Sequence, residues 1–329
     1  MRRTFVVGCP RSGTTIVQAL LARHPAVFTP PETALFEHLH GNLAWRWGDA
    51  QAQPKSARLR QRLGFTRKHE RDLFMTLQRM LPSAPAFLRH PSLRTRTFEK
   101  RFVALLDQLA EDADRSLWLE KTPNHLLYIP EIEALAPDAR FVHVIRPGAE
   151  VVASLIDTSL LFESDNTFGG GIVHWARRWN RAMQIHRAHQ GHAQHHLLFL
   201  EDLIEHPEQE WKRVCRFLDI ATDVPLDDAC TQIIADLENE PWKRKSVHGR
   251  LHTPQSKVDG LFGPKLQRWL QAKLVSYDDL HAQCLQARGH HDHAHDPHRR
   301  HRDRNVSILS PGSNLRRRLL DQGHDVVRA

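Results

Sequence analysis

Short apolar runs alternate along the chain with longer stretches in which apolar residues recur every three or four positions. The runs predict strands at residues 4–8, 26–29, 117–121, 140–146 and 196–201. The stretches between them have the spacing of helices, as at Phe98, Phe102, Leu105, Leu106 and Leu109. Strands and helices that alternate in this way form a parallel sheet flanked by helical layers. The pattern therefore predicts an α/β fold of three layers.

Two prolines mark the expected starts of helices. Pro147 precedes helical apolar spacing at residues 151–156, and Pro207 precedes the same spacing at residues 211–218. Proline is tolerated at the first helical position, because the N–H that it lacks would have no partner there. We therefore expect one helix to begin at each of these prolines.

Two regions depart from the alternation of strands and helices. Residues 38–115 contain no clear strand, and we expect a mainly helical insertion over the carboxyl edge of the sheet, on the acceptor side of the site described below. Residues 289–304, GHHDHAHDPHRRHRDR, are of low complexity, and such a composition cannot form a packed core. The sequence therefore predicts one domain at residues 1–287, and a disordered His/Arg-rich linker with a short tail at residues 288–329.

Composition narrows the class of protein. The net charge of +8 indicates an anionic ligand or partner, although many of the arginines lie in the last part of the chain. The four cysteines have neither metal-site spacing nor a dense disulfide pattern, so we expect reduced thiols. No apolar run approaches the roughly 20 residues of a membrane span, and the N-terminal run is too short for a signal peptide. These features predict a soluble, cytoplasmic protein.

The sequence VVGCPRSGTT, residues 6–15, joins the first predicted strand to a helix. Gly8 and Gly13 allow tight turns, and the N–H groups of the loop and of the helix start can then face one anion. A planar guanidinium at Arg11 fits phosphate or sulfonate oxygens. The phosphate loop of nucleotide-hydrolysing enzymes has a lysine after its second glycine, where this chain has Thr14. The alternative is an ordinary strand-to-helix turn with a capping threonine.

A second group of polar residues follows the fourth predicted strand, in RFVHVIRPGAEVVAS, residues 140–154. Arg146 ends an apolar run at the sheet edge where ligands of open α/β sheets collect. Ser154 lies about two helical turns further on, so it can face the same side as Arg146. A guanidinium and a hydroxyl that converge there suit a second phosphate. A structural ion pair and a serine on a helix face are the alternative interpretation.

Together, PRSGTT and VIRPGAEVVAS resemble the sulfotransferases that use 3′-phosphoadenosine 5′-phosphosulfate (PAPS), and the likeness runs from Thr4 to about Leu285. The resemblance implies a P-loop-like fold, PAPS as donor, a hydroxyl-bearing acceptor and no required metal. The first loop would hold the 5′-phosphosulfate, and Arg146 and Ser154 would hold the 3′-phosphate. Thr14 fits this donor, because PAPS has no β- or γ-phosphate that a lysine at this position would contact. The implied loop contacts are Pro10, Arg11, Ser12, Gly13, Thr14 and Thr15.

Sulfuryl transfer to a hydroxyl needs a base for the acceptor proton and cations for the leaving phosphate. Glu32 follows the second predicted strand, and its position resembles that of the base in tyrosylprotein and heparan sulfotransferases. A helix-capping role is its alternative, and Glu37, His38 and His40 compete as bases. Lys121 lies in LWLEKTPNH, residues 117–125, and in this family a lysine at such a position contacts the bridging oxygen. Another branch of the family uses a histidine shortly after this lysine as its base. The implied catalytic residues are Glu32, Lys121, Arg11 and His125.

The basic segment at residues 242–258 resembles the family's C-terminal loop over the nucleotide. This resemblance implies that Ser256 and Lys257, and also Lys245, reach the 3′-phosphate or the adenosine. A solvated basic loop is the alternative. The acceptor stays open among a carbohydrate, a lipid, a small metabolite and a peptide tyrosine.

Other functions stay open at this point. A P-loop kinase or NTPase is disfavoured by Thr14, and a catalytically idle PAPS-binding protein would keep the same binding residues. The histidines of residues 289–304 could bind Zn²⁺ or Ni²⁺ weakly. Neither nucleic acid nor a membrane span is expected, and a homodimer stays open.

Overall fold

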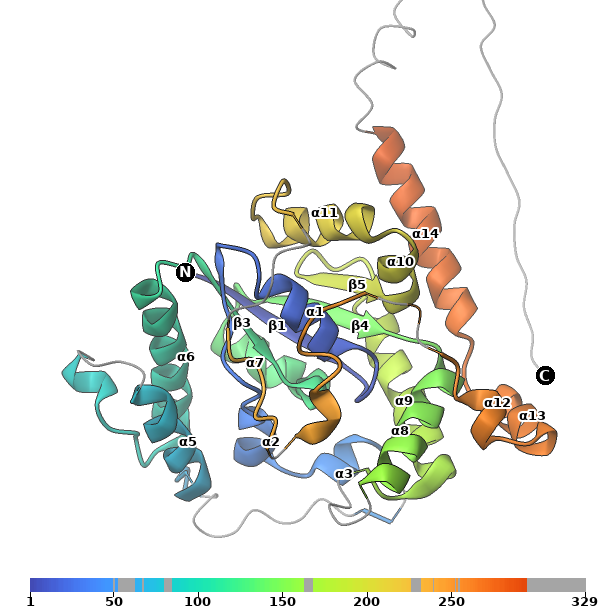
Figure 1. Ribbon diagram of the computed structural model, residues 1–329. Coiled ribbons are helices and arrows are strands. Elements are labelled where there is room, and N and C mark those ends of the chain that lie inside the picture. Colours follow the sequence, from blue (N-terminus) through green and yellow to red (C-terminus); the bar gives the residue numbers. More distant parts are fainter. Residues whose placement is uncertain are drawn as a thin grey trace, which may run out of the picture. The chain divides into compact units, whose positions relative to one another are not determined.

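The computed structural model describes residues 1–49, 51–52, 63–66, 68–79, 85–162, 168–225, 232–238, 240–251, 253 and 255–294 (Figure 1). It divides into two units, Met1–Cys284 and Leu285–Ala329. The first unit contains the sheet and the candidate site, and its architecture is given below. The predicted boundary between residues 287 and 288 stays a prediction, and most of the segment after it lies outside the described residues.

Five parallel strands form one sheet in the order β2-β3-β1-β4-β5 (Figure 1). The strands are β1 (Arg2–Gly8), β2 (Val27–Phe28), β3 (Leu117–Lys121), β4 (Arg140–Ile145) and β5 (His195–Phe199). In the central strand, Val6 lies opposite Lys121 of β3 and Val142 of β4. From β1, the connections run to β2 and β3 on one side of the sheet and to β4 and β5 on the other. In open α/β sheets this switch point is where ligands bind.

Helices connect the strands and cover both faces of the sheet. The α-helices are α1 (Thr14–Leu21), α2 (Leu35–His40), α3 (Leu43–Arg46), α5 (Lys68–Gln78), α6 (Thr95–Asp112), α7 (Ile129–Leu135), α8 (Gly148–Leu161), α9 (Gly171–Ala188), α10 (Leu200–Glu205), α11 (Pro207–Leu218), α12 (Val258–Leu261), α13 (Pro264–Lys273) and α14 (Tyr277–Ala294). Short 3-10 helices lie at η1 (Ala86–Leu88), η2 (Pro123–Tyr128) and η3 (Pro241–Lys243).

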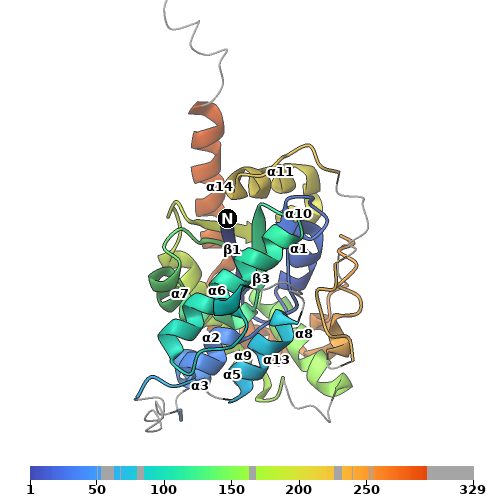
Figure 2. The same cartoon turned by 90° about the vertical axis from the view of Figure 1, so that its left-hand side faces the viewer.

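Alternating side chains of the central strands build two separate cores. Phe5, Val7 and Phe141 belong to the larger core, which includes α6, α7, α8 and α9. Val6 and Val142 belong to the core on the other face, which includes α1 and α11. Figure 2 shows α1 and α7 on opposite sides of the sheet. Because both faces are covered, the strands read as continuous apolar runs, and the predicted three-layer α/β fold is confirmed.

The structure corrects the ends of several predicted elements. Leu200 and Glu201, predicted as strand, begin α10, because Leu200 and Leu203 pack into the second core at helical spacing. Pro147 precedes α8 as its capping residue, whereas Pro207 is the first residue of α11 as predicted. The edge strand β2 is shorter than predicted, because only Val27 and Phe28 pair with β3.

The described part of residues 38–115 contains the helices α3, α5, η1 and α6, and one isolated bridge between Phe65 and Arg94. The low-complexity stretch that begins at residue 289 starts within α14, and its part from residue 295 lies outside the described residues. Among the helices that the structure describes, none combines the length and apolar character needed to cross a membrane.

Candidate active site

The loop between β1 and α1 turns tightly at the carboxyl end of the central strand. A Cβ added at Gly8 would lie 2.6 Å from the carbonyl oxygen of Val144, so the loop leaves β1 pressed against β4. Arg11 (φ 71°) and Gly13 (φ 100°) both have left-handed backbone conformations. Arg11 is strained there, whereas glycine adopts this conformation freely. Helix α1 begins directly afterwards at Thr14, so the positive end of its dipole faces the loop.

This loop contacts α8, which begins within the second predicted phosphate-binding segment. Nε of Arg11 donates a hydrogen bond to Oγ of Ser154 on α8 at 3.3 Å. Arg146, at the end of β4, lies 3.1 Å from Glu150 one helical turn away. Burial lowers the pKa of Arg11 to about 10, and repulsion from Arg146 adds to this. Two partly buried guanidinium groups that repel one another would favour an anion between them.

The C-terminal loop lies along α8, near the same arginine. Oγ of Ser256 donates a hydrogen bond to Glu150 at 2.6 Å, and Lys257 forms an ion pair with Asp157. Glu150 therefore contacts both Arg146 and Ser256. The structure thus brings Ser256 and Lys257 to α8, the helix of Ser154, while Lys245 is exposed.

Glu32 and Lys121 form an ion pair at the carboxyl end of β3. Oε2 of Glu32 lies 2.6 Å from Nζ of Lys121 and 2.5 Å from Nζ of Lys243. The side chain of Lys121 is fully buried, and burial lowers its pKa. Burial opposes ionisation of Glu32 as well, but the two lysines outweigh this effect and hold its pKa at about 2. Glu32 is therefore a carboxylate with two ammonium partners.

Sequence reasoning did not single out Lys243. It is buried in η3, contacts Glu32 and Glu240, and has a raised pKa because these carboxylates outweigh the effect of its burial. Residues 243–245 read KRK, and no periodicity indicates which basic side chain of such a loop turns inward. The only sequence signal is that this basic stretch follows Pro241 and Trp242, residues that favour an ordered turn.

His125 is fully buried and both of its ring nitrogens have partners within the protein. Nδ1 lies 2.8 Å from Glu120, and Nε2 accepts a hydrogen bond from the backbone N–H of Phe36 at 3.3 Å. Glu120 also accepts hydrogen bonds from the hydroxyls of Thr33 and Thr122, each at 2.7 Å. These contacts fasten the segment after Glu32 to the end of β3.

A second carboxyl group lies close to Glu32. Burial raises the pKa of Glu37 to about 7, and the neighbouring carboxylates of Glu32 and Glu120 act in the same direction. A carboxyl with a pKa near neutrality can exchange protons at physiological pH. His38 and His40, the other residues of α2 considered as bases, are both partly buried, and Nε2 of His40 lies 3.0 Å from Glu99.

The lysine partners of Glu32 predict an acid-sensitive contribution to stability. Because folding lowers its pKa from 4.5 to about 2, this contribution is complete above pH 4.5 and is lost as the pH falls towards 2. We expect its loss to reduce the free energy of unfolding by about 3 kcal/mol across that interval. Urea titrations at each pH measure this change. Glu32→Gln should remove this part of the pH dependence, and an unchanged pH slope would contradict the assignment.

Two curated relatives each match about two thirds of the chain. Protein-tyrosine sulfotransferase 2 of Gallus gallus is 26% identical over 225 residues, which cover 66% of this chain and 51% of the relative. Protein-tyrosine sulfotransferase of Drosophila melanogaster is 25% identical over 230 residues, which cover 68% of this chain and 38% of the relative. The chain thus spans about half, or less, of the length of these relatives.

Solved structures and a family model match as well. A sulfotransferase of Alicyclobacillus acidocaldarius has a TM-score of 0.44 at 15% identity, covering 82% of this chain and 98% of its own. Mouse sulfotransferase SULT7A1 complexed with PAP has a TM-score of 0.43 at 12% identity, covering 82% of each chain. The model of the sulfotransferase family matches residues 4–224, which include Arg11, Glu32, Lys121, Arg146 and Ser154. The chain therefore belongs to the sulfotransferase family, whose sulfuryl donor is PAPS.

Proposed function

We propose that the protein transfers the sulfuryl group of PAPS to the hydroxyl of an acceptor, with Glu32 as base. The observation that carries this proposal is a pair of contacts, one on each side of the carboxyl end of β1. On one side Arg11 contacts Ser154, and on the other Lys121 contacts Glu32. Groups for binding an anion and groups for moving a proton thus lie at the switch point of one sheet.

Donor binding would use the groups that now contact one another. The loop amides, the start of α1 and Arg11 would take the 5′-phosphosulfate, and Arg146 and Ser154 would take the 3′-phosphate. An anion between Arg11 and Arg146 relieves their mutual repulsion. Ser256 and Lys257 lie along the same helix and would close over the nucleotide.

The transfer itself would be an in-line displacement. The acceptor oxygen forms a bond to sulfur, the bond from sulfur to the bridging oxygen breaks, and 3′-phosphoadenosine 5′-phosphate (PAP) leaves. Lys121 would donate to the bridging oxygen as negative charge develops there. When Lys121 turns to the donor, Glu32 loses one of its two cations, so its pKa rises and it can accept the acceptor proton. Both nitrogens of His125 face protein partners, which favours Glu32 over His125 as base.

Glu37 is a second candidate for the proton-accepting group. Its pKa of about 7 suits a general base better than the value of Glu32 before the donor binds. The two carboxyls influence one another electrostatically, so a change of charge on Glu32 alters the pKa of Glu37. The identity of the base is therefore a separate question from the reaction class.

The names of the relatives are the only indication of the acceptor class. Those described above are protein-tyrosine sulfotransferases, so a tyrosine-containing peptide is the first acceptor to test. Carbohydrate, lipid and small-metabolite hydroxyls suit the same catalytic groups and belong in the same assay.

Turnover of labelled PAPS with a library of hydroxyl compounds tests the proposal. We expect PAP release that depends on an acceptor, and we expect PAP to raise the thermal midpoint of the protein. Arg146→Ala should weaken PAP binding about 100-fold, because a buried phosphate contact is lost, whereas Arg177→Ala on the exposed side of α9 should not. Hydrolysis of MgATP without any effect of PAP would instead support an NTPase. PAP binding without turnover of any acceptor would support an idle binding protein.

A further inference from the structure

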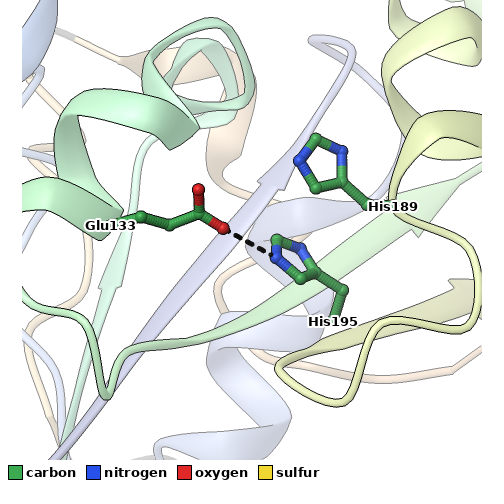
Figure 3. Close-up of side chains that lie close together, drawn as sticks. All are labelled: Glu133, His189 and His195. Carbon is green, nitrogen blue, oxygen red and sulfur yellow. Dashed lines mark hydrogen bonds and ion pairs between the residues drawn. The ribbon is translucent and has the colours of Figure 1, made fainter.

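Three ionisable side chains converge at the amino-terminal edge of the sheet, at the opposite end of the strands from the phosphate loop (Figure 3). Glu133 comes from α7, His189 follows the last residue of α9, and His195 is the first residue of β5. Their ligand atoms all lie within 4.8 Å of one another, and Nε2 of His195 lies 3.1 Å from Oε1 of Glu133. The cluster and Arg146 lie at opposite ends of β4, roughly 15 Å apart at the rise of a strand.

His189 is held in the tautomer and orientation of a metal ligand. Its Nδ1 lies 2.8 Å from the carbonyl oxygen of Ile185, which can only accept, so this nitrogen donates its proton. Nε2 is then left with a lone pair. Histidines that bind metals commonly donate their second ring N–H to a carbonyl or carboxylate in this way.

His195 is backed by two further buried histidines. Its Nδ1 lies 2.9 Å from Nε2 of His143, and Nδ1 of His143 lies 3.0 Å from Nδ1 of His186. Each of these contacts needs one donor and one acceptor. If His195 donates through Nδ1, its Nε2 lone pair faces the Glu133 carboxylate, and two acceptors then lie 3.1 Å apart. A cation between them satisfies both.

We propose that Glu133, His189 and His195 bind a divalent first-row transition metal ion, and that Zn²⁺ fits them best. Two imidazole nitrogens and one carboxylate oxygen are a ligand set that Zn²⁺ accepts in tetrahedral sites. His192 supplies a further imidazole, with its ring centre 5.8 Å from that of His189 and 5.9 Å from that of His195. The ion would join α7, the end of α9 and the start of β5, and would take no part in sulfuryl transfer.

Zn²⁺ titration of the metal-stripped full chain tests the site, with a chromophoric chelator as competitor. We expect one tight ion per chain, and at about 100-fold excess over the dissociation constant a thermal midpoint raised by roughly 5 °C or more. Glu133→Gln and His189→Ala should each weaken binding at least tenfold and, at the same Zn²⁺ concentration, reduce the thermal shift by about half or more. His90→Ala, an exposed histidine outside the cluster, should change neither.

The histidines from residue 290 onwards could also bind Zn²⁺, so they need their own variant, with asparagine at each. This variant should keep the tight ion and the thermal shift. If the shift disappears there but persists in His189→Ala, the proposal is wrong, and it is equally wrong if no variant of the cluster weakens binding. The visible absorption of bound Co²⁺ gives a second readout, and the PAP-induced thermal shift shows that each variant is folded.

Discussion

Replacing Glu32 by glutamine should lower kcat by about 10²- to 10⁴-fold and leave the affinity for PAP nearly unchanged. The amide keeps the size of the side chain but cannot accept the acceptor proton. Glu32 also pairs with the fully buried Lys121, so the variant loses stability, and rates must be referred to the folded fraction. Stopped assays of PAP release, together with PAP titration by calorimetry, measure both quantities.

Glu240→Gln is the matched control for this change. Glu240 is the other carboxylate that contacts Lys243, but the structure shows no contact between its side chain and Lys121 among the described ion pairs. We expect its kcat to stay within a factor of about 10 of the original, because the base is retained. If Glu32→Gln keeps its turnover while Glu37→Gln loses it, then Glu37 is the base and the assignment of Glu32 is refuted.

The sheet could be predicted because its central strands are buried on both faces. Such strands read as unbroken apolar runs, and β1, β3 and β4 were located within two residues of their observed ends. The carboxyl end of β5 could not be located in the same way. The apolar run continues through Leu200 into α10, and hydrophobicity alone does not distinguish the end of a strand from the start of a helix.

The closeness of the segments that contain Arg11 and Arg146 could be predicted for a related reason. Arg11 and Arg146 each follow a predicted strand, and neighbouring parallel strands bring such residues to one edge. Lys243 follows no strand and belongs to a basic loop, so only the folded chain shows which of its side chains reaches Glu32. The same holds for Glu133 of α7 and His189, which follows α9, because they share no motif spacing.

Replacing Lys121 by methionine should lower kcat by about 10²- to 10³-fold, the usual effect of removing one group that stabilises developing charge. Methionine fills most of the volume of the buried side chain, so the loss can be assigned to the charge. Because the ammonium acts on the leaving oxygen, single-turnover rates at saturating donor should fall while PAP affinity changes far less.

Lys243→Met separates this role from simple pairing with Glu32. Both lysines lower the pKa of Glu32 in the free protein, so removing either one should raise that pKa and move the acidic limb of the kcat/KM profile to higher pH. Only Lys121→Met should also lower the plateau above that limb, since only Lys121 lies at the strand end expected to face the bridging oxygen. If the two variants give the same plateau as the unaltered protein, Lys121 serves only to position Glu32, and another cation must stabilise the leaving phosphate.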